Sequence, residues 1–260
     1  METGATDTRR NPDGLFLRWD GREVQWAWRF RGSDANESET EFSFGTREVS
    51  KISMLPEVIR ALKGRYGTVN EVVYAQRFAR TTMVPAIVLK EDSEAAEKWF
   101  KFHHAPAQDV DLRIVHLEAI EGEPVFLEGL DPIWEASVKK SFTQAQGVVQ
   151  SAILMETAIS ISRQIDRWVV VIDAGEIGAD FSASVKGNAI WSGHSLKGDP
   201  ESILYSVVNA MHRNGMNQDG TAIRFTGLID HVLKDVFTRF FSDVESLGES
   251  KWEGLKSLAK

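Results

Sequence analysis

An aspartate and two glycines close an apolar run and have the residue types of a phosphate-binding loop. The run reads Val170-Val171-Ile172-Asp173-Ala174-Gly175-Glu176-Ile177-Gly178. Gly175 and Gly178 carry no Cβ, so backbone N–H groups there could approach a phosphate closely, and Asp173 could hold a metal-bound water. The same residues fit an ordinary hairpin connection, in which both glycines adopt positive φ and Asp173 ends a strand. The loop by itself leaves both interpretations open, and the hairpin is the commoner use of such glycines.

The elements around this loop are predicted from hydrophobic periodicity. Residues 168–173 form a continuous apolar run typical of a strand buried on both faces. Alternating residues predict strands over 179–186 and 189–194, joined by a turn at Gly187-Asn188. A helix from Pro200 to about residue 214, a strand over 222–226 and a helix over 230–244 complete the second half. This half therefore reads strand, strand, strand, helix, strand, helix.

The first half begins with the same order. Alternation predicts a hairpin from Leu15 to Trp28 around a two-residue turn at Asp20-Gly21, and core packing explains its large rings, Trp19, Trp26 and Trp28. The expected elements that follow are a strand at 41–44, a helix at 52–63, a strand at 69–78, a connection at 81–85, a helix from Asp92 or Ser93 to Phe102 and a strand at 111–120. The middle predicts a strand at 124–127, a helix at 131–140 and a stretch ending as a helix at 148–163.

Two halves with the same element order predict a duplicated architecture, although the residues themselves do not repeat. We expect an α/β protein with a first lobe over residues 14–143 and a second lobe over residues 144–247. A disordered tail over residues 1–13 and a C-terminal tail over residues 248–260 would flank the lobes.

A three-strand meander followed by helix, strand and helix, present twice, resembles the actin-like ATPase fold, with two ribonuclease-H-like lobes, each a mixed sheet with helices. The segment from Val170 to Gly178 resembles the second phosphate loop of that superfamily. The Val84-Pro85 connection, the helix from Lys90 to Phe102 and the closing segment 225–244 are similar to the bacterial domain-of-unknown-function family 3822, which has this fold. The likeness covers about residues 14 to 246.

Two departures from the superfamily pattern predict that ATP is not turned over. The resemblance implies a first phosphate loop after the first strand, but Asp20-Gly21-Arg22 there closes a tight turn. It also implies a glycine pair at the adenosine loop, where this chain has Gly227 followed by the bulky Leu228. Phosphoryl transfer needs positive groups around the developing charge. We therefore expect Asp173, Gly175 and Gly178 to form a vestigial phosphate loop and Gly227 to mark a vestigial adenosine loop, with no ATP or magnesium cofactor.

Composition narrows the remaining function classes. The 260 residues include no cysteine, which excludes disulfides and thiolate chemistry. The formal net charge of −8 disfavours binding to nucleic acid. No apolar run approaches the ~20 residues of a membrane span. The polar first twelve residues lack a secretory signal, and a cytoplasmic location is the simplest expectation.

Other polar constellations do not predict catalytic or metal-binding residues. His103 and His104 are adjacent, so on a helix they point about 100° apart and cannot grip one metal together. His194 lies near Ser192 and Ser195, but no nucleophile-elbow pattern accompanies them.

Three functions remain, and the first is favoured. The chain is expected to be a non-catalytic actin-like protein that binds an unknown protein partner as a scaffold or assembly factor. The alternative is an enzyme of the actin-like superfamily that binds or hydrolyses ATP through Asp173 and Gly175. RNA association is a third hypothesis, which the acidic charge disfavours.

Overall fold

The fold is described from a computed structural model that defines residues 11–31, 40–89, 94–104, 110–117 and 123–259. Most of the predicted disordered tail, the caps proposed at Asp92 and Ser93, and the end of the strand predicted at 111–120 lie outside these residues. The chain divides into two compact units. Unit 1 contains Met1–Arg77, Asp131–Val148 and Leu255–Lys260, and unit 2 contains Phe78–Leu130 and Val149–Gly254. The lobe boundaries at residues 143 and 247 stay a prediction.

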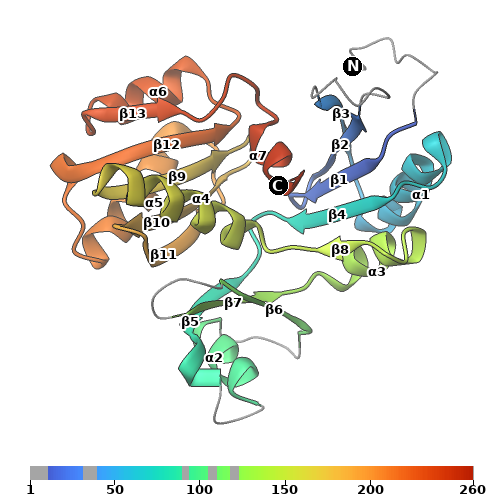
Figure 1. Cartoon of the computed structure of the whole chain (residues 1–260), viewed down its shortest axis with the longest axis horizontal. Coiled ribbons are helices and arrows are strands. Elements are labelled where there is room, and N and C mark those ends of the chain that lie inside the picture. The colour runs from blue at the N-terminus through green and yellow to red at the C-terminus, as the bar shows by residue number, and fades with distance from the viewer. Residues whose placement is uncertain (1–10, 32–39, 90–93, 105–109, 118–122, 260) are drawn as a thin grey trace. The chain divides into compact units, whose positions relative to one another are not determined.

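Unit 1 is built on a five-stranded mixed sheet in the order β3-β2-β1-β4-β8 (Figure 1). Its strands are β1 (Gly14–Trp19), β2 (Glu23–Arg31), β3 (Thr40–Glu48), β4 (Glu71–Gln76) and β8 (Gln146–Gly147). The first three form an antiparallel meander, and β4 runs parallel to β1. Helices α1 (Leu55–Tyr66) and α3 (Pro132–Ser141) contribute to the same hydrophobic core as Leu15, Leu17 and Trp19. Trp19 stacks on Trp134 with ring centroids 6.3 Å apart, which confirms that this part of the hairpin packs into the core.

Unit 2 contains a second five-stranded sheet with the matching order β11-β10-β9-β12-β13. Its strands are β9 (Trp168–Ala174), β10 (Ala179–Val185), β11 (Asn188–Ser195), β12 (Thr221–Gly227) and β13 (Asp243–Ser246). Again the first three are antiparallel, and β12 runs parallel to β9. Helices α5 (Pro200–Arg213) and α6 (His231–Thr238) supply apolar residues to the core of this sheet. The duplicated architecture is therefore present, one copy in each unit.

The helix that completes the first copy is not the predicted one. The series β1, β2, β3, α1, β4, α3, β8 matches β9, β10, β11, α5, β12, α6, β13, so α3 corresponds to α6. The helix predicted up to Phe102 is α2 (Ala95–His103), and it belongs to an inserted segment with a three-stranded sheet in the order β5-β7-β6. Those strands are β5 (Thr81–Pro85), β6 (Leu112–His116) and β7 (Pro124–Gly129). The connection predicted at 81–85 is wrong, because those residues pair with β7, and a local pattern does not reveal a distant partner.

The end of the chain differs from the prediction in the same way. The helix expected over 230–244 ends at Thr238, and residues 243–246 instead form β13 beside β12. An ion pair joins these two strands, since Arg224 Nη1 lies 2.7 Å from Asp243 Oδ1. The predicted C-terminal tail contains α7 (Glu253–Lys256) and the short 3-10 helix η4 (Ser257–Ala259), and it buries Leu255 and Leu258.

Helix α4 (Gln150–Ile165) is one continuous helix in the stretch that the sequence left mixed. One side packs on Val169, Val171 and Ala222 of the second sheet, and another contacts Phe126 of the inserted sheet. Serines on the helix bond directly to β10: Ser162 Oγ lies 2.8 Å from Ser184 Oγ, and Ser182 Oγ donates to the carbonyl of Ser151. Across the described parts of the chain, no helix combines the length and apolar character needed to span a bilayer.

Candidate functional site

The connection from Gly175 to Gly178 joins β9 to β10 as a tight hairpin. Ala174 pairs with Ala179, and the N–H of Gly175 donates to the carbonyl of Gly178 at 2.8 Å. This N–H is thus used inside the connection. Neither glycine has a positive φ, contrary to the expectation for a hairpin. At Gly178 the requirement is close approach, because an added Cβ would overlap the carbonyl oxygen of Ser195.

Asp173 lies at the end of β9 and is completely buried. Its Oδ2 accepts a hydrogen bond from Nε2 of Gln150 at 3.1 Å. Gln150 is the first residue of α4 and is only 2 % exposed. A buried carboxylate needs such donors, since its desolvation is costly. The sequence did not single out Gln150, because its role depends on where the start of α4 meets the end of β9.

Gly227 is brought directly against Asp173. It ends β12 beside Ala174 of β9, and the N–H of Leu228 donates to the carbonyl of Ala174 at 2.9 Å. Gly227 has a φ of 83°, and an added Cβ would overlap both the Ala174 carbonyl and Oδ1 of Asp173. The residues predicted for the phosphate and adenosine loops therefore meet at the carboxyl ends of two parallel strands.

A second glycine, Gly254, covers the same carboxylate and was missed by the sequence analysis. Gly254 is buried, and an added Cβ would stand 2.6 Å from both Cγ and Oδ2 of Asp173. That separation is well inside the 3.5–4.0 Å of a normal carbon contact. The C-terminal chain thus packs directly against the carboxylate of Asp173. No sequence pattern marks this contact, because Gly254 is far from Asp173 in the sequence.

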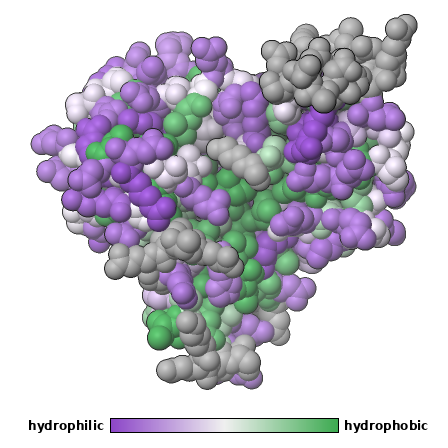
Figure 2. Space-filling model, in the orientation of Figure 1, coloured by the Kyte–Doolittle hydropathy of each residue, from purple (hydrophilic) through white to green (hydrophobic). Residues whose placement is uncertain are grey.

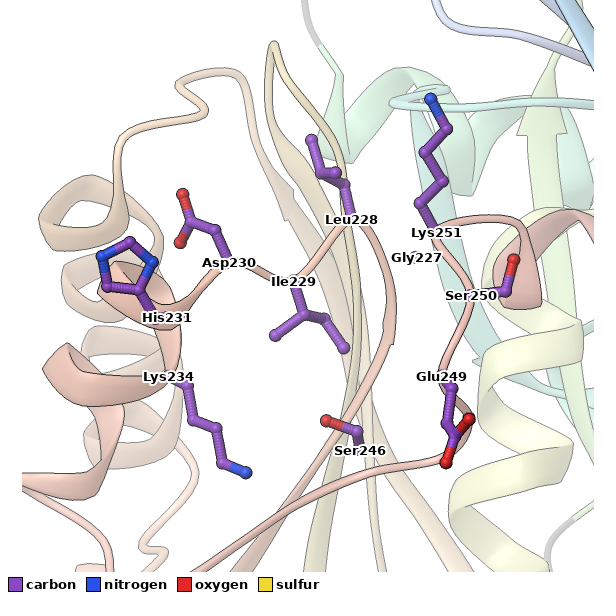
Figure 3. A pocket seen from close by; sticks show the side chains of 11 residues that line it. Gly227, Leu228, Ile229, Asp230, His231, Lys234, Ser246, Glu249, Ser250 and Lys251 are labelled. Carbon is purple, nitrogen blue, oxygen red and sulfur yellow. The ribbon is translucent and has the colours of Figure 1, made fainter. Parts of the chain in front are cut away.

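A cavity of about 480 Å³ lies next to these glycines. Figure 3 shows Asp230, His231 and Lys234 along one side and Glu249, Ser250 and Lys251 along the other. Asp230 is engaged there as the N-cap of α6, with Oδ1 accepting from the N–H of Leu233 at 2.7 Å. The side chains of Lys234 and Lys251 extend in opposite directions, so these two cations do not converge on one anion (Figure 3).

The corresponding connection in unit 1 uses its aspartate locally. Three residues, Asp20 to Arg22, lie between β1 and β2, one more than the predicted turn. Oδ1 of Asp20 accepts from the N–H of Arg22 at 2.9 Å and from that of Glu23 at 2.7 Å, and Gly21 has a φ of 94°. The Asp20 side chain thus shapes its own turn, as aspartates commonly do.

The two adjacent histidines lie at the end of α2. His103 is its last residue, and His104 follows with its Nε2 2.9 Å from Oγ1 of Thr82 on β5. Burial lowers the pKa of His104 below its usual value. This histidine therefore joins α2 to the inserted sheet.

No family model matches the chain, and no curated protein matches it by sequence. Solved structures do match it. A Bacteroides thetaiotaomicron VPI-5482 protein described as having an actin-like ATPase fold and unknown function is 16 % identical, covers 99 % of this chain and 100 % of its own, and gives a TM-score of 0.76.

Two further matches also cover more than nine tenths of the chain. One is the PilM-PilN type IV pilus biogenesis complex, at 16 % identity, 93 % and 89 % coverage and a TM-score of 0.59. The other is the ethanolamine utilization protein EutJ from Carboxydothermus hydrogenoformans, at 10 % identity, 95 % and 88 % coverage and a TM-score of 0.51. At sequence identities this low, a structural match establishes the fold alone. Together with the duplicated sheet order, these matches show that the chain has the actin-like ATPase fold.

Proposed function

We propose that this chain is a non-catalytic actin-like protein of the cytoplasm that works by binding a protein partner, as a scaffold or assembly factor. One observation carries the proposal. The backbone of Gly254 lies against the carboxylate of Asp173, so the residue that the fold offers for a metal-bound phosphate faces the chain's own C-terminal segment.

The connection in each unit uses groups of its own for local hydrogen bonds. The N–H of Gly175 donates to Gly178, and the carboxylate of Asp20 accepts from its own turn. A phosphate or a metal ion that used these particular groups would have to break these interactions first. We therefore propose that the residues present do not fit ATP and magnesium, and we assign no catalytic step to them.

An exposed aromatic surface on the inserted segment supports partner binding. Trp99 and Phe102 of α2 are 38 % and 77 % exposed, and their ring centroids lie 6.2 Å apart. With Lys98 they line a cavity of about 250 Å³. Apolar surface is visible at the lower end of the view in Figure 2, where Figure 1 places α2. Exposed aromatic residues are enriched at protein interfaces.

The size of this surface favours a short segment of a partner over a second copy of the chain. A stable interface buries about 800 Å² on each side, far more than two exposed rings provide. A cavity of about 250 Å³ suits one apolar side chain of a bound peptide segment. Among proteins with this fold, PilM occurs in a complex with PilN, which is consistent with work by partner binding.

The nucleotide part of the proposal is tested by thermal unfolding with Mg-ATP. A ligand present at a hundredfold its Kd adds about 2.7 kcal/mol to the free energy of unfolding. We expect no change in the unfolding temperature at millimolar Mg-ATP. A reproducible rise, with ATP hydrolysis above that of an Asp173→Ala variant, would instead establish the enzyme alternative.

The partner-binding part is tested by cross-linking in cells with a photoreactive residue at position 102. We expect one protein to be captured there and lost when Trp99 is also replaced by serine. Tyr205, which is 72 % exposed on α5, is the matched control position. Capture of the same protein at positions 102 and 205, or capture unaffected by Trp99→Ser, would contradict binding at this surface.

A further inference from the structure

Residues 248–254, here called the strap, lead from the end of β13 to the start of α7 and close over Asp173. Gly254 at the end of the strap and Gly227 at the end of β12 both lie against the carboxylate, and neither position has room for a Cβ. Gln150 bonds to the same carboxylate from α4. Asp173 is thus contacted by three segments that are far apart in the sequence: the start of α4, the end of β12 and the strap. Among these three, α4 and β12 are regular elements, whereas most of the strap lies outside any helix or strand.

The strap has the features of a segment that can open locally. Glu249 and Lys251 are exposed. Two of its hydrogen bonds are local, from the N–H of Glu253 to the carbonyl of Ser250 at 3.1 Å and from the N–H of Trp252 to Oγ of Ser250 at 3.2 Å. Segments with local bonds and exposed side chains open at lower free energy than core strands. By contrast, β9 and β12, whose ends carry Asp173 and Gly227, are buried along nearly their whole length.

Opening the strap would change the site in a defined way. Residues 248–251 line the cavity of about 480 Å³, and Gly227 lines it too, beside Ser250 and Lys251 in the view of Figure 3. Withdrawal of the strap, including Gly254, would uncover the carboxylate of Asp173. The space that Gly254 leaves would then be continuous with the cavity.

We infer that the strap is an intramolecular lid that keeps the carboxylate of Asp173 closed to ligands and exposes it only when residues 248–254 lift away. The inference concerns contacts inside unit 2 alone. It stands whether or not the inserted segment binds a protein partner.

A single added methyl group tests the closed contact. Gly254→Ala places its Cβ against the carboxylate, so the closed strap must shift or open. Asp173→Ala removes the obstructing atoms, and the double variant should close again. Gly220→Ala is the matched control, because an added Cβ there meets no atom within 4 Å.

The measurement is the rate of trypsin cleavage after Lys251, followed by mass spectrometry under native conditions. Cleavage of a locally opened segment follows the population of the open form. We expect Gly254→Ala to be cleaved at least about tenfold faster than the wild type, Gly220→Ala to match the wild type, and the double variant to return close to the rate of Asp173→Ala alone. Equal rates for Gly254→Ala and the wild type, or no relief in the double variant, would refute the closed contact.

Hydrogen exchange of the wild-type protein provides a test that needs no variant. The amides of residues 249–253 should exchange faster than the amides of β9 and β12. Their exchange rate should not change at low denaturant concentration, because a local opening exposes little surface. If the strap amides exchange only with global unfolding, at the same free energy as β9, the strap is fixed packing and the lid does not exist. This result decides the question even if Gly254→Ala fails to fold.

Discussion

Replacing Asp243 with asparagine should destabilise the protein by about 2–3 kcal/mol, because it removes the charge that balances a buried arginine. The side chain of Arg224 is only 7 % exposed. Its Nη1 and Nη2 lie 2.7 and 3.3 Å from the two oxygens of Asp243, and Arg167 contacts the same carboxylate. This pair fastens β13 to β12, directly before the strap begins.

The magnitude follows from the burial of both partners. Breaking a fully buried ion pair costs about 3–5 kcal/mol. Asp243 keeps 18 % of its side-chain exposure, and Glu245 also lies 3.3 Å from Nε of Arg224. Both features reduce the loss, which gives about 2–3 kcal/mol, or a fall of about 4 to 12 °C in the unfolding temperature.

The same pair predicts a pH dependence with a definite sign. Hydrogen bonding from Arg224 lowers the pKa of Asp243, and the charges of Arg224 and Arg167 lower it further. A carboxylate with a lowered pKa stabilises the fold fully above its unfolded pKa of about 3.9, and this contribution is lost as the pH falls through the folded pKa. The difference between the wild type and Asp243→Asn should therefore be constant near neutral pH and shrink below about pH 4.

The assay is urea and thermal unfolding followed by circular dichroism at several pH values. Asp235→Asn is the control, since Asp235 is an exposed residue of α6, and it should change stability by less than about 0.5 kcal/mol. Arg224→Met combined with Asp243→Asn should recover part of the loss, because no unbalanced buried charge then remains; Arg167 and Glu245, which lose a partner, are both partly exposed to solvent. A loss from Asp243→Asn of less than about 0.5 kcal/mol at pH 7 would show that the pair does not stabilise the sheet.

Three further predictions concern the site and its surroundings. Gly227→Ala should lose at least about 1–2 kcal/mol in urea unfolding, since a positive φ strains alanine and its Cβ overlaps Ala174; an unchanged midpoint would contradict the close approach. Leu258→Ala should lose about 2–5 kcal/mol by cavity formation, whereas Leu196→Ala, 69 % exposed, should lose less than about 0.5 kcal/mol; similar losses would mean that the C-terminal residues are not packed. Burial lowers the pKa of His104, so the unfolded chain binds a proton more readily than the folded one. The free energy of unfolding of the wild type should therefore fall as the pH drops below about 6.5. His104→Gln should lack this fall when the stability of both proteins is measured against pH.

The order of the elements could be read from the sequence because the burial of each element leaves its own local pattern of apolar residues. The alternation around Asp20-Gly21, the continuous apolar strand before Asp173 and the helix opened by Pro200 all report their own burial, and the structure contains all three. The duplicated order follows from these local signals. The glycine and aspartate at the ends of β9 and β12 were also visible, although only as separate positions.

Tertiary structure decided which elements belong together. Residues 81–85 became a strand because β7 lies beside them, and residues 243–246 became a strand because Arg224 and β12 hold them. A strand that pairs with a distant segment has no local pattern that identifies its partner. For the same reason, the sequence assigned α2, and not α3, as the helix that completes the first copy of the duplicated order.

The environment of Asp173 was likewise decided by tertiary structure. Its type and position were evident in the sequence, but its burial depends on Gln150, Gly227 and Gly254, which come from three other segments. Close approach of backbone to a carboxylate needs only a glycine, and a glycine in a sequence does not say what it approaches. The sequence by itself thus determined that a carboxylate stands at the end of a buried strand, and the packing of distant segments determined that the chain itself covers it.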